Sequence, residues 1–321
     1  MSAQSVGLGS MFGWIPAAFR LVGSNVGAML IASLVSLGLL LLMLLPMVIA
    51  MAFFMPGLTE AVNAGAPPVG ANPVPVLVGY GVMMVAFFGL YPPLMIGWFH
   101  VCQHIDRGQS VRGLDVLRPY ADGQLWLRAL RFALLALLVY IGVFALFALA
   151  FGNVFGAVMQ QAAAQQAAAL SGASIPATSL PSGFFLAYAL MMVLSLLLQV
   201  AYMLGFAEIS LRQTTALEAM KLAGAGTARN ALKLLLFFMC TLFLLFVGVF
   251  VVALVLALVI GGLALLSPTA SVVAAVLLYL PVFLLMYPLL FAGHYLVWKS
   301  TLGGDPLAGP TGDHEQAALV A

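Results

Sequence analysis

The chain has 321 residues, of which 64% are hydrophobic and only 6% are charged, with a net charge of +2. An ordinary soluble domain carries about 25% charged residues, so this chain cannot present a wetted surface on every side and needs lipid around it. Its few basic residues lie next to apolar stretches and form no separate basic patch, which excludes nucleic acid as an expected partner. We expect one membrane domain.

The basic residues predict an orientation. All eleven Lys and Arg residues lie in four short segments, namely around Arg20, from Arg107 to Arg131, from Arg212 to Lys233, and at Lys299. Because Lys and Arg resist translocation, they are retained in cytoplasmic loops, and this pattern predicts that both termini are cytoplasmic.

Six stretches are long enough to cross the hydrocarbon, which takes about 20 apolar residues in a helix. They cover residues 25–50, 77–101, 128–152, 183–207, 231–262 and 272–298. No segment alternates apolar and polar residues as a strand of a transmembrane barrel does. The sequence therefore predicts an all-α, multi-pass bundle of six transmembrane helices in residues 1–302. The tail at 303–321 has too little apolar content to fold alone and is expected to be disordered and cytoplasmic.

Four tryptophans flank the basic segments, namely Trp14, Trp98, Trp126 and Trp298. At headgroup depth an indole keeps its ring in apolar surroundings and its N–H in water. We therefore expect all four indoles at the cytoplasmic interface.

The second, fourth and sixth stretches share a pattern near their cytoplasmic ends. Residues 91–101 read YPPLMIGWFHV, residues 199–209 read QVAYMLGFAEI, and residues 287–297 read YPLLFAGHYLV. They align on Gly97, Gly205 and Gly293, which we expect at equivalent depth where neighbouring helices come close. The pattern predicts three parallel two-helix repeats at 11–105, 111–213 and 214–302. Chance similarity among Leu-rich helices is the alternative.

The cytoplasmic segments have the spacing of amphipathic helices. Thr215 and Glu218 form the pattern of a capping box, and Asp115 precedes Arg118 by three residues, which pairs opposite charges on one helix face. One interpretation is that these segments are interfacial helices that bind anionic lipid headgroups, and the other is that they are ordinary elbows between spans. The candidate headgroup-binding residues are Arg112, Arg118, Arg128, Arg131, Arg212, Lys221, Arg229 and Lys233.

Motifs that carry chemistry are few. His100 and His104 share a helix face, and His294 has a nearby register in the sixth stretch, so a histidine metal site is conceivable; ordinary interface histidines are the other interpretation. Glu208 and Arg212 are spaced as a helical ion pair. The sequence has no P-loop, no G-x-S-x-G, no H-E-x-x-H and no ionisable residue at the centre of a span. We expect no enzyme activity, no metal and no cofactor.

Two motifs carry a resemblance to a known family. The G-W-x-x-x-A-F-R pattern at 13–20 and the H-I-D-R-G-Q turn at 104–109 resemble an uncharacterised family of bacterial six-helix inner-membrane proteins. The layout is also distantly similar to the membrane domain attached to some glycerophosphodiester phosphodiesterases. The resemblance implies a multi-pass protein of the bacterial inner membrane, without a catalytic domain or an assigned activity.

Two functions remain open at this point. The first is a non-enzymatic membrane protein that organises or assists a lipid or envelope process, with membrane lipids and other membrane proteins as partners. The alternative is a passive or partner-driven transporter of an amphiphilic solute through the centre of the three repeats. A continuous polar cavity along the central axis would favour transport, and a closed apolar axis would favour the first function.

Overall fold

The computed structural model describes residues 6–63, 74–171 and 180–303. Over these residues the chain is helical and contains no strand. Six of the described helices are long and apolar enough to cross a membrane, which confirms the expected multi-pass helix bundle. The predicted tail lies outside the described residues except for Gly303.

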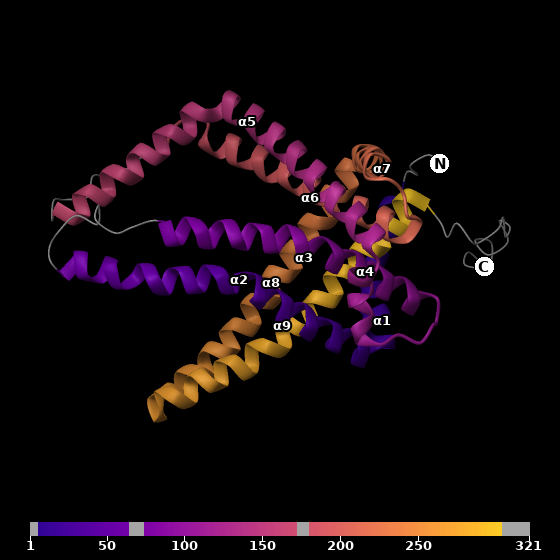
Figure 1. Cartoon of the computed structure of the whole chain (residues 1–321), viewed down its shortest axis with the longest axis horizontal. Coiled ribbons are helices and arrows are strands. Elements are labelled where there is room, and N and C mark those ends of the chain that lie inside the picture. The colour runs from indigo at the N-terminus through magenta and orange to yellow at the C-terminus, as the bar shows by residue number, and fades with distance from the viewer. Residues whose placement is uncertain (1–5, 64–73, 172–179, 304–321) are drawn as a thin grey trace.

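Three helical hairpins form most of the molecule (Figure 1). They pair α2 (Val26–Asn63) with α3 (Val74–Asp106), α5 (Gly123–Ser171) with α6 (Phe184–Arg212), and α8 (Ala231–Leu266) with α9 (Pro268–Trp298). The helices extend beyond the expected spans. The 49 residues of α5 correspond to about 73 Å, more than twice the hydrocarbon thickness of about 30 Å. The Gln- and Ala-rich run at 159–170 continues this helix because both residue types are good helix formers.

Five shorter elements lie at the end where the hairpins converge (Figure 1). They are α1 (Leu8–Ser24), η2 (Gly113–Leu117), α4 (Arg118–Ala121), α7 (Ala216–Arg229) and η3 (Lys299–Gly303). One local prediction is confirmed here, since Arg118 Nε lies 3.0 Å from Asp115 Oδ1. The predicted capping box is confirmed in part: Thr215 Oγ1 accepts from the Glu218 N–H at 3.4 Å, but among the described residues the Glu218 side chain does not return a bond to Thr215.

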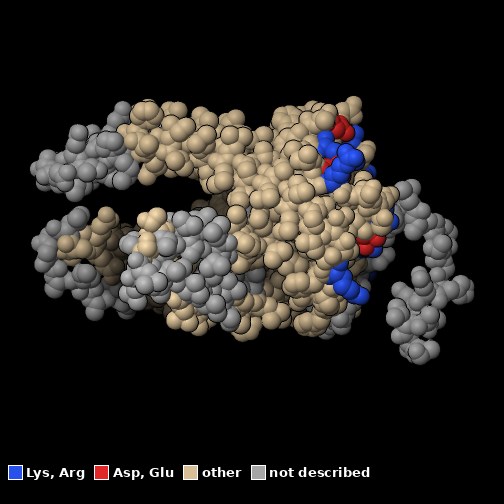
Figure 2. All heavy atoms as spheres, turned by 90° about the horizontal axis from the view of Figure 1, so that it is seen from below, with Lys and Arg blue, Asp and Glu red and all other residues tan. Residues whose placement is uncertain are grey.

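The buried core is concentrated toward this convergent end. Its largest fully buried aromatic side chains are Trp98, Phe99, Phe132, Phe206 and Phe291. Farther along, the hairpins diverge and are separated from one another at their tips (Figures 1 and 2). Apolar side chains there are exposed on the bundle, as at Val85 (75%) and Leu149 (84%). Such surface is stable only in a hydrocarbon environment.

Contacts between the hairpins follow a cyclic order. The first helix of each hairpin packs against the second helix of another: α5 against α3, α8 against α6, and α2 against α9. The short elements keep the same order, with η2 against α2 and α3, α7 against α5 and α6, and α1 against α8 and α9. The second helices α3, α6 and α9 also contact one another. The hairpins thus close a ring around these three helices.

The three aligned glycines differ in how closely other atoms approach them. A Cβ on Gly97 would lie 1.9 Å from the Val116 carbonyl oxygen, and one on Gly205 would lie 2.0 Å from the Phe132 ring. At Gly293 a Cβ would meet nothing within 4 Å. The expectation of a close approach by another element is therefore correct at Gly97, where the neighbour is the η2 backbone, and wrong at Gly293. At Gly205 the space is filled by the Phe132 side chain of α5.

Candidate functional site

Charged side chains gather at the convergent end of the bundle (Figure 2). Five of the eight predicted headgroup-binding residues are exposed there, namely Arg112, Arg118, Arg131, Lys221 and Arg229. The Arg118 side chain is 65% exposed even though it pairs with Asp115, so solvent screens that pair. These side chains are accessible to anionic groups.

The other three predicted residues are half-buried and bind the protein itself. Arg128 Nη1 donates to the Gln213 carbonyl oxygen at 2.7 Å, and Lys233 Nζ donates to the Val6 carbonyl oxygen. The Arg212 side chain is only 9% exposed. In each case the cation joins segments that are distant in sequence, a structural role that the sequence did not reveal.

Arg212 belongs to a buried cluster with Glu208 and Trp298. Arg212 Nη1 lies 3.2 Å from Glu208 Oε1, as the spacing predicted. The Trp298 indole N–H donates to the same oxygen at 2.9 Å, and the guanidinium carbon lies 5.5 Å from the centroid of the Trp298 ring. Arg212 Nη2 also donates to the carbonyl oxygens of Leu302 and Gly303. The cluster therefore ties the end of α6 to α9 and η3.

The exposure to headgroups and water expected for the tryptophans is wrong for three of them. Trp14, Trp98 and Trp298 are buried. The Trp98 N–H donates to Ser36 Oγ at 2.8 Å, and its ring stacks on Phe291 at a centroid distance of 5.1 Å. An apolar ring with one N–H suits a packed core with an internal acceptor as well as it suits headgroups, and here the core prevails.

Trp126 is half-buried and donates to the Gly89 carbonyl oxygen at 2.9 Å. This carbonyl would pair with the N–H of the residue four positions later in α3, but that residue is Pro93, which has none. One residue along, the hydroxyl of Tyr120 donates to the Leu90 carbonyl oxygen. Burial raises the pKa of the Tyr120 phenol. Trp126 in the first turn of α5 thus supplies the donor that Pro93 lacks, and Tyr120 of α4 adds a second contact to the same part of α3.

Exposed apolar side chains accompany the exposed basic ones on the short elements. Phe12 (58%) and Phe19 (59%) lie on α1 near Arg20, Leu114 (61%) lies on η2, and Leu217 (57%) lies on α7 one turn before Lys221. Basic side chains beside exposed apolar ones are typical of helices at a membrane interface.

A polar pocket of about 370 Å³ lies between the ends of α3 and α6, the η2–α4 segment and the start of α5. Its ionisable and amide side chains include His100, Gln103, His104, Asp115, Arg118 and Asp122. His100 and His104 are thus brought together, as expected, but His294 bonds to the Leu290 carbonyl oxygen within α9. Among the described residues no group of three His, Cys, Asp or Glu side chains could hold a metal ion.

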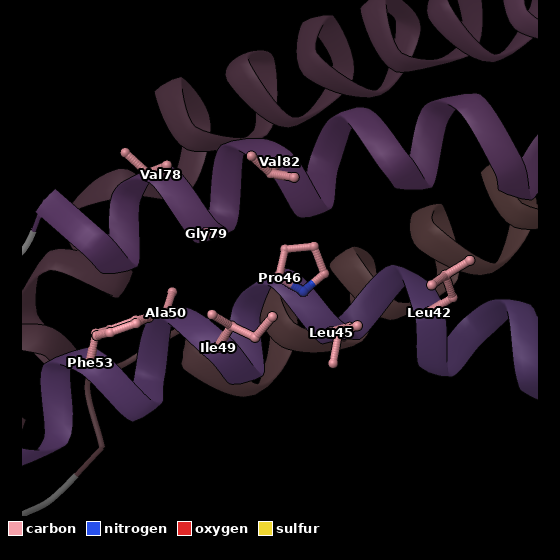
Figure 3. Close-up of a pocket in the computed structure, with 9 residues that line it drawn as sticks. All are labelled: Leu42, Leu45, Pro46, Ile49, Ala50, Phe53, Val78, Gly79 and Val82. Carbon is pink, nitrogen blue, oxygen red and sulfur yellow. The ribbon is translucent and has the colours of Figure 1, made fainter.

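A second pocket, of about 450 Å³, lies between α2 and α3 toward the tip of their hairpin. Figure 3 shows its lining, which consists of apolar side chains and a glycine: Leu42, Leu45, Pro46, Ile49, Ala50, Phe53, Val78, Gly79 and Val82. A Cβ on Gly79 would lie 2.3 Å from that of Ala50, so glycine permits the close helix approach. Among the described residues, no polar side chain lines this pocket to orient a ligand.

The chain matches no family model, no curated protein and no solved structure among those compared with it. The resemblance to the bacterial six-helix family stays a prediction, and function is inferred from the geometry of the chain.

Proposed function

We propose that this chain is a non-enzymatic, multi-pass protein of a bacterial inner membrane that binds anionic lipid headgroups at its cytoplasmic end and so organises or assists a lipid or envelope process. One observation carries the proposal: exposed basic side chains and exposed apolar side chains occur together on the short elements at one end of the bundle. Apolar side chains that enter the headgroup region and cations that bind phosphates act together there.

The proposal includes three parallel repeats with both termini in the cytoplasm. The cyclic packing order supports the repeats, because each short element and the hairpin that follows it make equivalent contacts with another hairpin. Parallel repeats of two spans are related by an axis along the membrane normal, which agrees with a ring of hairpins. The cluster of Lys and Arg at the convergent end supports the orientation.

Packing along the central axis favours this function over the transporter. Near the convergent end, Phe99 of α3 meets Phe291 of α9 with ring centroids 6.0 Å apart, and both side chains are buried. Aromatic side chains thus fill the contact between two of the three central helices, where a conducting path would have to pass. A transporter would need this contact to open.

The test compares bound lipid in the wild type and in the variant Arg112→Gln/Arg131→Gln/Lys221→Gln. All three side chains are exposed, and eight of the eleven basic residues remain to maintain the orientation. Native mass spectrometry in detergent with equal phosphatidylglycerol and phosphatidylcholine measures the retained lipid. Each cation near the surface contributes about 1 kcal/mol, or about fivefold in affinity, so the triple variant should lose most of its retained phosphatidylglycerol.

Glu218→Gln is the control of opposite sign, because it removes an exposed negative charge from α7 and should not reduce phosphatidylglycerol retention. Equal retention by the wild type and the triple variant would refute the proposal and leave these residues as topology signals.

A further inference from the structure

The polar pocket at the convergent end has walls that are already held in place. His100 Nε2 lies 2.7 Å from the Ser210 carbonyl oxygen, which joins α3 to α6. Asp115 Oδ2 accepts from the Arg112 backbone N–H at 2.8 Å. Asp122 caps α5, its Oδ1 accepting from the N–H groups of Gln124 and Leu125, each at 3.0 Å. The pocket is thus pre-organised and does not depend on a ligand for its shape.

Three side chains in these walls, those of Gln103, Asp122 and His104, can still form hydrogen bonds with a ligand. Gln103 is only 8% exposed, and its carboxamide lines the pocket without a hydrogen-bond partner among the described residues. The amide atoms are not among the buried polar atoms that lack a partner, so they are accessible from the pocket, and a ligand group can replace water as their partner. Asp115 is neutralised by Arg118, whereas Asp122 uses Oδ1 for capping and has no ion pair in the described part of the chain. His104 borders the same space with no side-chain hydrogen bond to another described residue.

These groups differ in the ligand charge that they favour. The unpaired carboxylate of Asp122 and the carbonyl oxygen of Gln103 accept hydrogen bonds and suit an ammonium group. The Arg118 guanidinium and the His104 ring N–H donate and suit a phosphate. Apolar side chains of Val111, Leu125 and Leu211 also line the pocket and can contact methylene groups.

We propose that this pocket binds an aminoalkyl phosphate, a small group with a primary ammonium and a phosphate joined by a short methylene chain, as in ethanolamine phosphate. The ammonium lies against Asp122 and Gln103, and the phosphate lies against Arg118 and His104. A volume of about 370 Å³ accommodates such a group but not two acyl chains. The group is supplied by a lipid headgroup or by the free molecule. The site shares Arg118 with the exposed cations described above, but the anionic-lipid contact is tested with Arg112, Arg131 and Lys221, which do not line this pocket.

The test uses the full chain in detergent with equal phosphatidylethanolamine and phosphatidylcholine, two zwitterionic lipids that differ in the nitrogen. The nitrogen of phosphatidylcholine is trimethylated and cannot donate hydrogen bonds. Native mass spectrometry should show roughly tenfold preferential retention of phosphatidylethanolamine by the wild type, because one charge-assisted hydrogen bond is worth about a decade in affinity. Equal retention of the two lipids by the wild type would overturn the proposal.

Two variants and one control locate the site. Asp122→Asn removes the charge while keeping a residue that caps helices well, and it should abolish the preference. Gln103→Met replaces the unpaired amide by an apolar chain of similar length, so the preference should fall while thermal stability is maintained or rises. Asp106→Asn removes a carboxylate from a different ion pair, with Lys299 at 2.6 Å, and should leave the preference intact. Persistence of the preference in Asp122→Asn, or its loss in Asp106→Asn, would refute the assignment.

Free O-phosphoethanolamine distinguishes the two sources of the ligand. Displacement of retained phosphatidylethanolamine by millimolar O-phosphoethanolamine would support a pocket for the small group itself. Retention despite the competitor, with dependence on Asp122, would support a pocket that takes the group from a lipid. Failure of the anionic-lipid proposal would be seen separately, because that proposal is tested with phosphatidylglycerol and with Arg112, Arg131 and Lys221.

Discussion

The substitution Glu208→Ala should destabilise the bundle more than any change on its charged surface. Glu208 is fully buried and accepts from both Arg212 and Trp298. Its removal leaves the indole N–H without an acceptor, at about 1–3 kcal/mol, and leaves the Arg212 charge uncompensated. Breaking a buried ion pair by removing one partner costs about 3–5 kcal/mol in total. Since Arg212 keeps its bond to the Leu302 carbonyl oxygen at 3.1 Å, we expect a value toward the lower end.

Glu208→Gln should cost less than Glu208→Ala, because the amide oxygen still accepts from the Trp298 indole. The assay is thermal unfolding in detergent, followed by tryptophan fluorescence. At roughly 2 °C per kcal/mol for a chain of this size, a cost of about 3 kcal/mol means that Glu208→Ala should lower Tm by about 6 °C. The matched control is Glu218→Ala, which makes the same change at an exposed position and should stay within about 0.5 kcal/mol of the wild type.

The reasoning would be refuted if Glu208→Ala melted at the temperature of Glu218→Ala, or if Glu208→Gln were as unstable as Glu208→Ala. Either result would mean that the carboxylate is not the shared acceptor that joins α6 to α9.

Three further predictions concern packing and orientation. Gly97→Ala should destabilise the folded chain by about 1–3 kcal/mol, because the new Cβ would lie 1.9 Å from a backbone oxygen. Gly293→Ala places its Cβ in open space and should be neutral or stabilising. Equal melting temperatures of the two variants would contradict this prediction. Trp126→Phe should lower the free energy of unfolding by about 1–3 kcal/mol, because it removes the donor to the Gly89 carbonyl oxygen. In a Pro93→Ala background the new backbone N–H supplies that donor, so the loss should be smaller. An equal loss in both backgrounds would contradict the role assigned to Trp126. The predicted orientation, with the convergent end in the cytoplasm, is tested in a Cys102→Ala/Cys240→Ala background. Ala167→Cys should react with an impermeant maleimide in intact cells, and Ala228→Cys should not. The reverse labelling pattern would overturn this orientation.

Local features of the fold could be predicted from the sequence because neighbours within one helix follow from spacing alone. The Thr215 cap, the Asp115–Arg118 pair and the Glu208–Arg212 pair all join residues three or four positions apart, and all three occur. The spans could be predicted for a similar reason, since their length and apolar character are properties of continuous segments. These features do not depend on how one helix packs against another.

Tertiary structure alone decided which distant surfaces meet. Trp298 and Glu208 are 90 residues apart and His100 and Ser210 are 110 apart, and no spacing rule predicts either contact. The burial of three tryptophans was not predicted, because a ring with one N–H is compatible with headgroups and with a core. Gly293 was misjudged because alignment of repeats gives equivalent positions but not equal distances to a neighbour. The polar pocket combines side chains from α3, α4, α5 and α6, so it exists only once these helices have packed.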